Sequence, residues 1–89
     1  MKTFKDLKFK THPLGERHGI QALINFDDGS QISVIQGPNF YSSELTYEMM
    51  SNRFHRKDDV RGYLSPRQIT RHMIYIQKNP LNKLKTIKK

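Results

Sequence analysis

The sequence predicts an α+β fold, in which a small antiparallel β-meander of about four strands packs against one C-terminal helix. Segments near residues 7–11, 20–26, 30–36 and 45–50 alternate apolar and polar side chains, which is the period of a half-buried strand. Residues 66–78 instead repeat apolar side chains every three to four positions, as an amphipathic helix does. Glycine and proline separate the alternating segments, so each is expected to end in a turn.

The length of 89 residues supports one small domain, which we expect over residues 1–80, and leaves residues 81–89 as a basic, flexible C-terminal tail. The absence of cysteine excludes disulfides, thiolate chemistry and cysteine-based zinc sites. No apolar run approaches the ~20 residues that a membrane span needs. We therefore expect a cytoplasmic protein that binds no membrane and needs no cofactor.

A β-hairpin is the strongest structural signal in the chain. Two alternating segments are joined by Asp27-Asp28-Gly29, and a two-residue turn at this point would mix the two faces of the sheet. A three-residue loop instead pairs Ile24 with Ile32 and Ala22 with Val34. It also places the glycine at the left-handed position that a type I turn with a bulge requires. The sequence therefore predicts the three-residue loop.

Both ends of the helix are marked in the sequence. Ser65-Pro66-Arg67-Gln68 offers a capping serine, a proline at the first helical position and a glutamine that completes a capping box. Asn79-Pro80 supplies the stop. The buried stripe should combine with the strands into one core, made of Ile24, Phe26, Ile32, Val34, Tyr47, Ile69, Met73 and Ile76.

The net charge of +8 lies entirely on the last third of the chain. Residues 1–59 carry eight basic and eight acidic side chains, whereas residues 60–89 carry eight basic and no acidic ones. A neutral body with a cationic end is typical of a protein that meets a polyanion. The pattern indicates a class of partner and does not identify it.

The C-terminal third supplies the main candidate binding residues. Arg67, Arg71 and Lys78 fall on one side of the predicted helix, opposite the buried stripe, and Ile74 lies among them and should be exposed. Lysines continue the charge into the tail, at Lys83, Lys85, Lys88 and Lys89. Such a surface could follow a phosphate backbone, because each neutralised phosphate releases counterions. A solubilising face followed by a disordered tail is the alternative.

Two further clusters are weaker candidates. Phe40 and Tyr41 could stack on unpaired bases or anchor a protein interface, although one ring could equally fold back over the sheet. Arg53, Arg56 and Lys57 form a second basic cluster, which the adjoining acidic pair at 58–59 partly neutralises. The chain offers no stronger signal in its middle third.

No enzymatic or metal motif is present. The four histidines do not have the spacing of metal ligands, and no cysteine assists them. His72 is expected to complete the packing of helix against sheet. A histidine-and-glutamate ribonuclease site, such as His72 with Glu48, depends on proximity in the fold and stays open. We expect no metal and no enzymatic activity.

Several motifs together resemble short, largely uncharacterised accessory proteins of tailed phages and prophages. They are Phe26-Asp27-Asp28-Gly29, Ser33-Val34, Gly37, Tyr47-Glu48 and Asp59-Val60-Arg61-Gly62-Tyr63-Leu64-Ser65-Pro66. The similarity spans residues 20–78. It implies a meander-plus-helix protein that acts in the cytoplasm of an infected bacterial host.

The chain departs from this group at two points. Ser30-Gln31 stands where the group tends to carry tyrosine and glycine, so any role of that tyrosine does not transfer. Arg67-Gln68 follows the proline where the group's helix often starts acidic. Nucleic-acid binding therefore does not follow from the resemblance.

Two functional hypotheses remain. The first is a non-enzymatic module that binds nucleic acid or a ribonucleoprotein surface through the basic helix and tail. The second is a protein that inhibits a host enzyme or antiphage defence complex, as an anti-CRISPR-like or host-takeover protein would. Its charge would match an acidic protein surface or a groove that receives nucleic acid on the target, through electrostatic steering.

Overall fold

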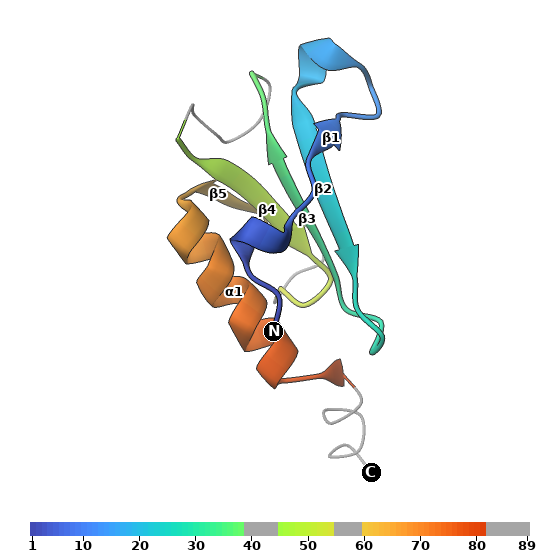
Figure 1. Ribbon diagram of the computed structural model, residues 1–89, viewed down its shortest axis with the longest axis vertical. Helices are drawn as coiled ribbons and strands as arrows, with labels where there is room; N and C mark the ends of the chain where they lie inside the picture. Colours follow the sequence, from blue (N-terminus) through green and yellow to red (C-terminus); the bar gives the residue numbers. More distant parts are fainter. Residues whose placement is uncertain (39–44, 55–59, 82–89) are drawn as a thin grey trace.

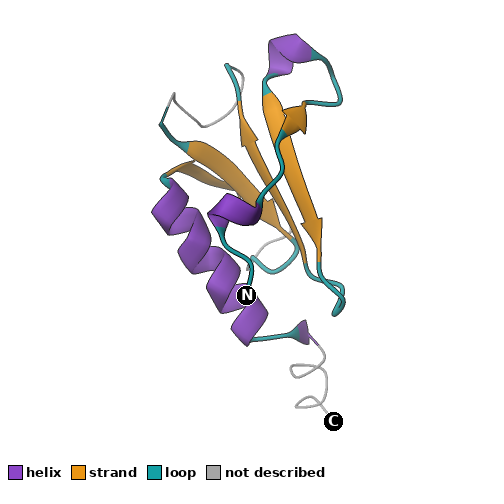
Figure 2. Ribbon diagram, in the orientation of Figure 1, coloured by secondary structure: helices purple, strands orange, loops and turns teal. Residues whose placement is uncertain are grey.

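The computed structural model describes residues 1–38, 45–54 and 60–81. It is a two-layer α+β fold, in which a five-stranded antiparallel sheet of order β1-β2-β3-β4-β5 carries one helix on one face (Figure 1). The regular elements, shown in Figure 2, also include two short 3₁₀ turns. In chain order they are η1 (Phe4–Asp6), β1 (Lys10–Thr11), η2 (Glu16–His18), β2 (Ile20–Asn25), β3 (Gln31–Gln36), β4 (Tyr47–Ser51), β5 (Val60–Leu64) and α1 (Pro66–Lys78).

The hairpin of β2 and β3 confirms the predicted three-residue loop. Ile24 pairs with Ile32 and Ala22 with Val34, as the burial pattern requires. Gly29 has a φ of +91°, so a side chain other than glycine would be strained at this position. The register therefore follows from the combination of turn chemistry and burial.

The prediction of about four strands was wrong by one, because residues 60–64 form a fifth strand. β5 departs from regular pairing: Tyr47 pairs with Leu64 and Met49 with Arg61, which leaves one extra residue on the β5 side. Tyr63 occupies this bulge with a φ of +54°. The bulge breaks the alternation of side chains that sequence reasoning depends on. The predicted strand at 7–11 is also shorter, since only Lys10–Thr11 pairs.

Helix α1 has the predicted bounds, and its cap explains where it begins. The Ser65 side chain accepts a hydrogen bond from the Gln68 backbone N–H (3.2 Å), and the Gln68 side chain accepts one from the Ser65 N–H (2.8 Å). This reciprocal box satisfies two of the backbone donors that the first turn leaves unpaired. No helix in the described part of the chain is long and apolar enough to cross a membrane.

The core lies between the helix and the sheet. Five of the predicted core residues are buried there, namely Ile32, Val34, Ile69, Met73 and Ile76. Ile24, Phe26 and Tyr47 are only half-buried and pack against its edge. The cluster also contains residues that the prediction left out, which are Leu7, Ala22, Met49 and Leu64.

A polar clasp joins the hairpin loop to the end of the helix, and Arg53 is its centre. The Arg53 guanidinium donates to the Ser30 hydroxyl (2.9 Å) and to the backbone oxygens of Ile76 (3.3 Å) and Asn79. Its Nη1 lies 3.8 Å from the Asp28 carboxylate. A helix C-terminus favours a cation for two reasons: its last carbonyl groups lack partners within the helix, and it carries a partial negative charge.

The clasp extends to the start of the C-terminal segment. Asp28 accepts hydrogen bonds from the backbone N–H of Ser30 (2.9 Å) and of Leu81 (2.8 Å). These bonds hold the pKa of the Asp28 carboxyl below its usual range, with the Ser30 bond as the larger cause. The chain therefore leaves the helix along a fixed path as far as Leu81.

Candidate nucleic-acid interface

Arg67, Arg71 and Lys78 are all exposed on the side of α1 that faces away from the sheet. We call these three residues the basic face. The burial of Ile69 and Met73 fixes the rotation of the helix about its axis, and this rotation places the three cations on the side that faces solvent. Because the helix rises 1.5 Å per residue, the basic face extends over about 16 Å. That length corresponds to roughly five steps of 3.4 Å along a nucleic-acid strand.

No acidic side chain offsets the basic face on its own helix. The sequence contains no aspartate or glutamate after Asp59, so every charged group of α1 is a cation. Two anions in the rest of the described chain are engaged elsewhere: Asp28 belongs to the clasp, and the Asp6 carboxylate accepts from the Thr3 N–H at 2.8 Å. The cations of the helix are therefore not paired with a neighbouring carboxylate along it.

Ile74 was predicted to be exposed among these cations, and the structure instead half-buries it. Its neighbours on the helix surface are Thr70 and Gln77, which lie four residues before it and three after it. Thr70 accepts from the Phe4 N–H (3.0 Å), and Gln77 bonds the backbone of Lys2 (2.8 and 2.7 Å). The N-terminal segment thus covers this flank of the helix, a contact that local sequence patterns could not reveal.

Tyr75 is a surface residue that the sequence analysis did not single out. It is 66% exposed and lies four residues after Arg71 and three before Lys78. Residues at these spacings are neighbours on a helix surface, so the ring lies beside two cations. An aromatic ring next to phosphate-binding side chains can stack on a base. The missed signal was the helical spacing between the tyrosine and the basic residues.

Arg53 does not belong to this surface. Its side chain is only 6% exposed, and its donors are used inside the molecule by the clasp. Arg53 was predicted to be a binding residue of a second basic cluster, whereas in the structure its side chain is buried. Eight of the predicted binding residues lie outside the described residues; they are Arg56, Lys57, Phe40, Tyr41, Lys83, Lys85, Lys88 and Lys89.

His72 was predicted to complete the packing of helix against sheet, and its ring contacts Phe54, in the turn that follows β4. The His72 ring lies 5.5 Å from that of Phe54, and the guanidinium of Arg61 on β5 lies 4.9 Å from the Phe54 ring centre. Burial lowers the pKa of His72, and the positive charge of Arg61 lowers it further. The imidazole is therefore held towards its neutral form within a packed aromatic contact.

The ribonuclease alternative is disfavoured by the position of Glu48. Met49, its neighbour on β4, is fully buried against the helix, so alternation along the strand turns Glu48 to the opposite face. Glu48 pairs there with Ile35, and the sheet separates it from His72. Among the described residues, no group of three or more histidine, aspartate or glutamate side chains could hold a metal ion.

Comparison with known proteins adds no further information on this surface. No protein family matches the chain, and no curated protein or solved structure is similar enough to match it.

Proposed function

We propose that this protein is a non-enzymatic binding module whose basic face contacts the phosphate backbone of nucleic acid, alone or in a ribonucleoprotein. The observation that supports it most is the exposure of Arg67, Arg71 and Lys78 on one helix face with no acidic residue beside them. Tyr75 adds a ring that can stack on a base. The cationic segment from 82 to 89 continues from the same end of the helix and would add long-range attraction.

Titration of a labelled oligonucleotide, followed by fluorescence anisotropy at several salt concentrations, tests this proposal. Phosphate contact predicts a linear fall of log affinity with log salt, because counterions are released on binding. Replacing both Arg67 and Arg71 with glutamate should weaken binding and reduce the steepness of that fall by about two phosphate contacts. Both side chains are exposed, so the variant should melt as the wild type does.

Arg17→Glu is the matched control, since Arg17 is exposed on η2, away from the helix. It should change affinity much less than either helix substitution. Equal losses for Arg17→Glu and Arg71→Glu would show that only net charge matters. Absence of binding at about 50 mM salt, where phosphate contacts are strong, would refute the proposal.

The second candidate is inhibition of a host enzyme or antiphage defence complex through the same surface. Tyr75 next to Arg71 favours it, because tyrosine and arginine are enriched at the centres of protein interfaces. The resemblance to phage and prophage proteins would place this action in the cytoplasm of an infected bacterium. A partner retained stoichiometrically from nuclease-treated host lysate, and lost with Tyr75→Ala, would favour this candidate over the first.

A further inference from the structure

One flank of α1, beside the basic face, carries aromatic rings between two cations. Tyr75 is 66% exposed and lies four residues after Arg71 and three after His72, so it borders both on the helix surface. The His72 ring lies 5.5 Å from the Phe54 ring, and the guanidinium of the exposed Arg61 lies 4.9 Å from the Phe54 ring centre. Neighbouring side chains therefore connect the basic face to β5. We call these residues the aromatic track.

Helix α1 lies along the sheet with both of its flanks covered, which limits the kind of nucleic acid that it can meet (Figure 1). On one flank the N-terminal segment bonds Thr70 and Gln77, and on the other His72 contacts Phe54. A helix that reads a DNA duplex enters the major groove, which is about 12 Å wide. An α-helix with its side chains is already about 10–12 Å across, so the covering segments would collide with the groove walls. Deep insertion of α1 into a duplex is therefore disfavoured.

We propose that the basic face and the aromatic track together bind a single strand of nucleic acid in preference to a duplex. This inference rests on the proposed function and specifies its ligand. Unpaired bases expose their faces, so an exposed ring such as Tyr75 can stack on one base while the cations beside it hold the phosphates. In a duplex each base face is already stacked on its neighbour. Arg61 then extends the phosphate contacts from the helix to β5.

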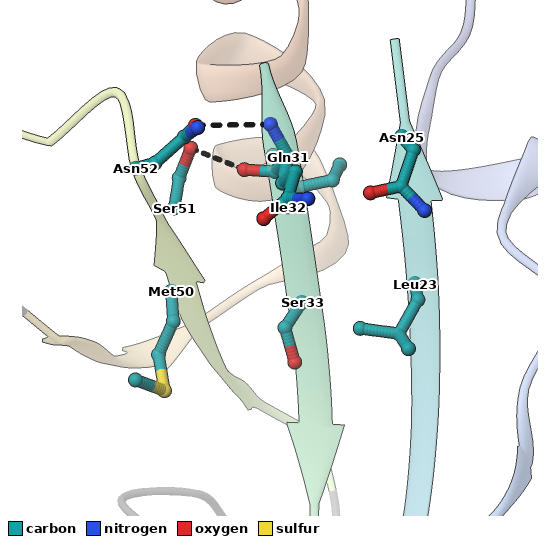
Figure 3. Close-up of a pocket in the computed structure, with 8 residues that line it drawn as sticks. All are labelled: Leu23, Asn25, Gln31, Ile32, Ser33, Met50, Ser51 and Asn52. Atoms are coloured by element: carbon teal, nitrogen blue, oxygen red, sulfur yellow. Dashed lines mark hydrogen bonds between the residues drawn. The ribbon is translucent and has the colours of Figure 1, made fainter. Parts of the chain in front are cut away.

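The opposite face of the sheet does not offer this combination of rings and cations. Figure 3 shows a hollow between Leu23 and Met50, and the described residues that line it include neither a cation nor an aromatic side chain. A neighbouring hollow, which Leu23 also lines, contains Lys8 and Lys10 but, within the described part of the chain, no aromatic ring. A ligand that needs stacking and phosphate contacts together is therefore expected on the α1 side.

Anisotropy titration of one labelled strand of about 20 nucleotides, alone and annealed to its complement, tests this inference. That length exceeds the roughly five nucleotides that the basic face spans. Charge alone predicts tighter binding to the duplex, because a duplex carries twice as many phosphates per unit length. Stacking predicts the reverse, so we expect the single strand to bind at least about fivefold more tightly.

The titration is run with DNA and with RNA, which separates the two sources of a single strand. A preference for the single strand over its own duplex in either series supports the inference. Equal or tighter binding to the duplex in both series would overturn it and leave the proposed function intact. Absence of binding to every probe at about 50 mM salt would refute both.

Tyr75→Leu removes the ring and keeps an apolar side chain, whereas Tyr75→Phe is the matched control that keeps the ring. Tyr75→Leu should weaken binding to the single strand at least about fivefold without changing its salt dependence, because no charge is removed. Tyr75→Phe should bind as the wild type does. Equal affinities for the two variants would show that the ring does not stack on a base, and would overturn the inference.

Arg61→Met tests the extension of the track to β5. It should reduce the fall of log affinity with log salt by about one phosphate contact. Arg17→Met is the matched control, because it removes the same charge from an exposed position on η2. Melting curves would show that each variant is folded. An equal reduction by Arg61→Met and Arg17→Met would mean that Arg61 contacts no phosphate, and would overturn the assignment of Arg61.

Discussion

The clasp predicts that Arg53 is required for stability, although arginine is ordinarily a surface residue. Arg53→Met keeps most of the side chain's apolar length and removes the guanidinium. The substitution deletes the donors to the Ser30 hydroxyl and to the backbone oxygens of Ile76 and Asn79. It also removes the cation that lies 3.8 Å from the Asp28 carboxylate. The end of the helix and the hairpin loop would then lose the bridge that Arg53 makes between them, while the bond from the Leu81 N–H to Asp28 would remain.

The magnitude follows from the burial of these groups. Arg53 is 6% exposed, so the partners that it leaves have little access to water. Loss of one hydrogen bond from a charged group costs about 1.5–3 kcal/mol, and the substitution removes three such bonds. We expect Arg53→Met to lower the free energy of unfolding by about 3 kcal/mol. For a domain of 89 residues that loss corresponds to a fall in Tm of about 12–24 °C.

Urea unfolding followed by circular dichroism, at a temperature where both proteins are folded, measures this loss. Arg53→Lys should recover little of it, because an ammonium group cannot reproduce the planar fork that reaches several acceptors. Arg67→Met is the control, since Arg67 is exposed and should change stability by less than about 0.5 kcal/mol. A loss below about 1 kcal/mol for Arg53→Met would show that the clasp does not hold the helix.

Three further substitutions test a close backbone contact, the packed histidine and the carboxylate of the clasp. Gly19→Ala should destabilise the protein by more than about 2 kcal/mol in urea unfolding, because φ is +88° and the added Cβ would lie 2.0 Å from the Gln36 carbonyl oxygen. The pKa of His72 is lowered in the folded protein, so on acidification the unfolded chain takes up a proton at a higher pH than the folded one does. Stability should therefore fall as pH drops below about 6.5, and His72→Gln should make that fall less steep. The pKa of Asp28 is also lowered, so its carboxylate stabilises the folded protein fully above about pH 4, and this stabilisation is lost as pH falls through the folded pKa. Asp28→Asn should therefore lose less stability in acid than the wild type does.

The parts of the fold that sequence reasoning predicted correctly are set by local chemistry. The hairpin register follows from Asp27-Asp28-Gly29 and the alternation beside it, which together leave one acceptable pairing. The helix bounds follow from Ser65, Gln68 and Pro80, which act within one turn of the helix ends. Each of these signals lies within a few residues of the structure that it determines.

The parts that it missed depend on contacts between distant segments. β5 was not recognised because the bulge at Tyr63 interrupts its alternation, and its pairing with β4 crosses a long connection. Arg53 has the sequence context of a surface cluster, and only the approach of the hairpin loop and the helix end turns it inward. The helix flank on which Ile74 lies is bonded at Thr70 and Gln77 by a segment about 70 residues earlier in the chain. A local sequence pattern cannot predict contacts between residues that are this far apart in the chain.

The position of Arg53 also separates two ways in which a basic residue can support binding. Arg53→Met and Arg71→Met each remove one positive charge, but only Arg71 is exposed on the basic face. A residue that contacts phosphate contributes about one unit to the slope of log affinity against log salt. Arg71→Met should therefore reduce that slope by about one unit, whereas folded Arg53→Met should leave it nearly unchanged. Anisotropy titrations at low temperature would measure both slopes. An equal reduction by the two variants would mean that binding senses the total charge of the molecule and not the basic face.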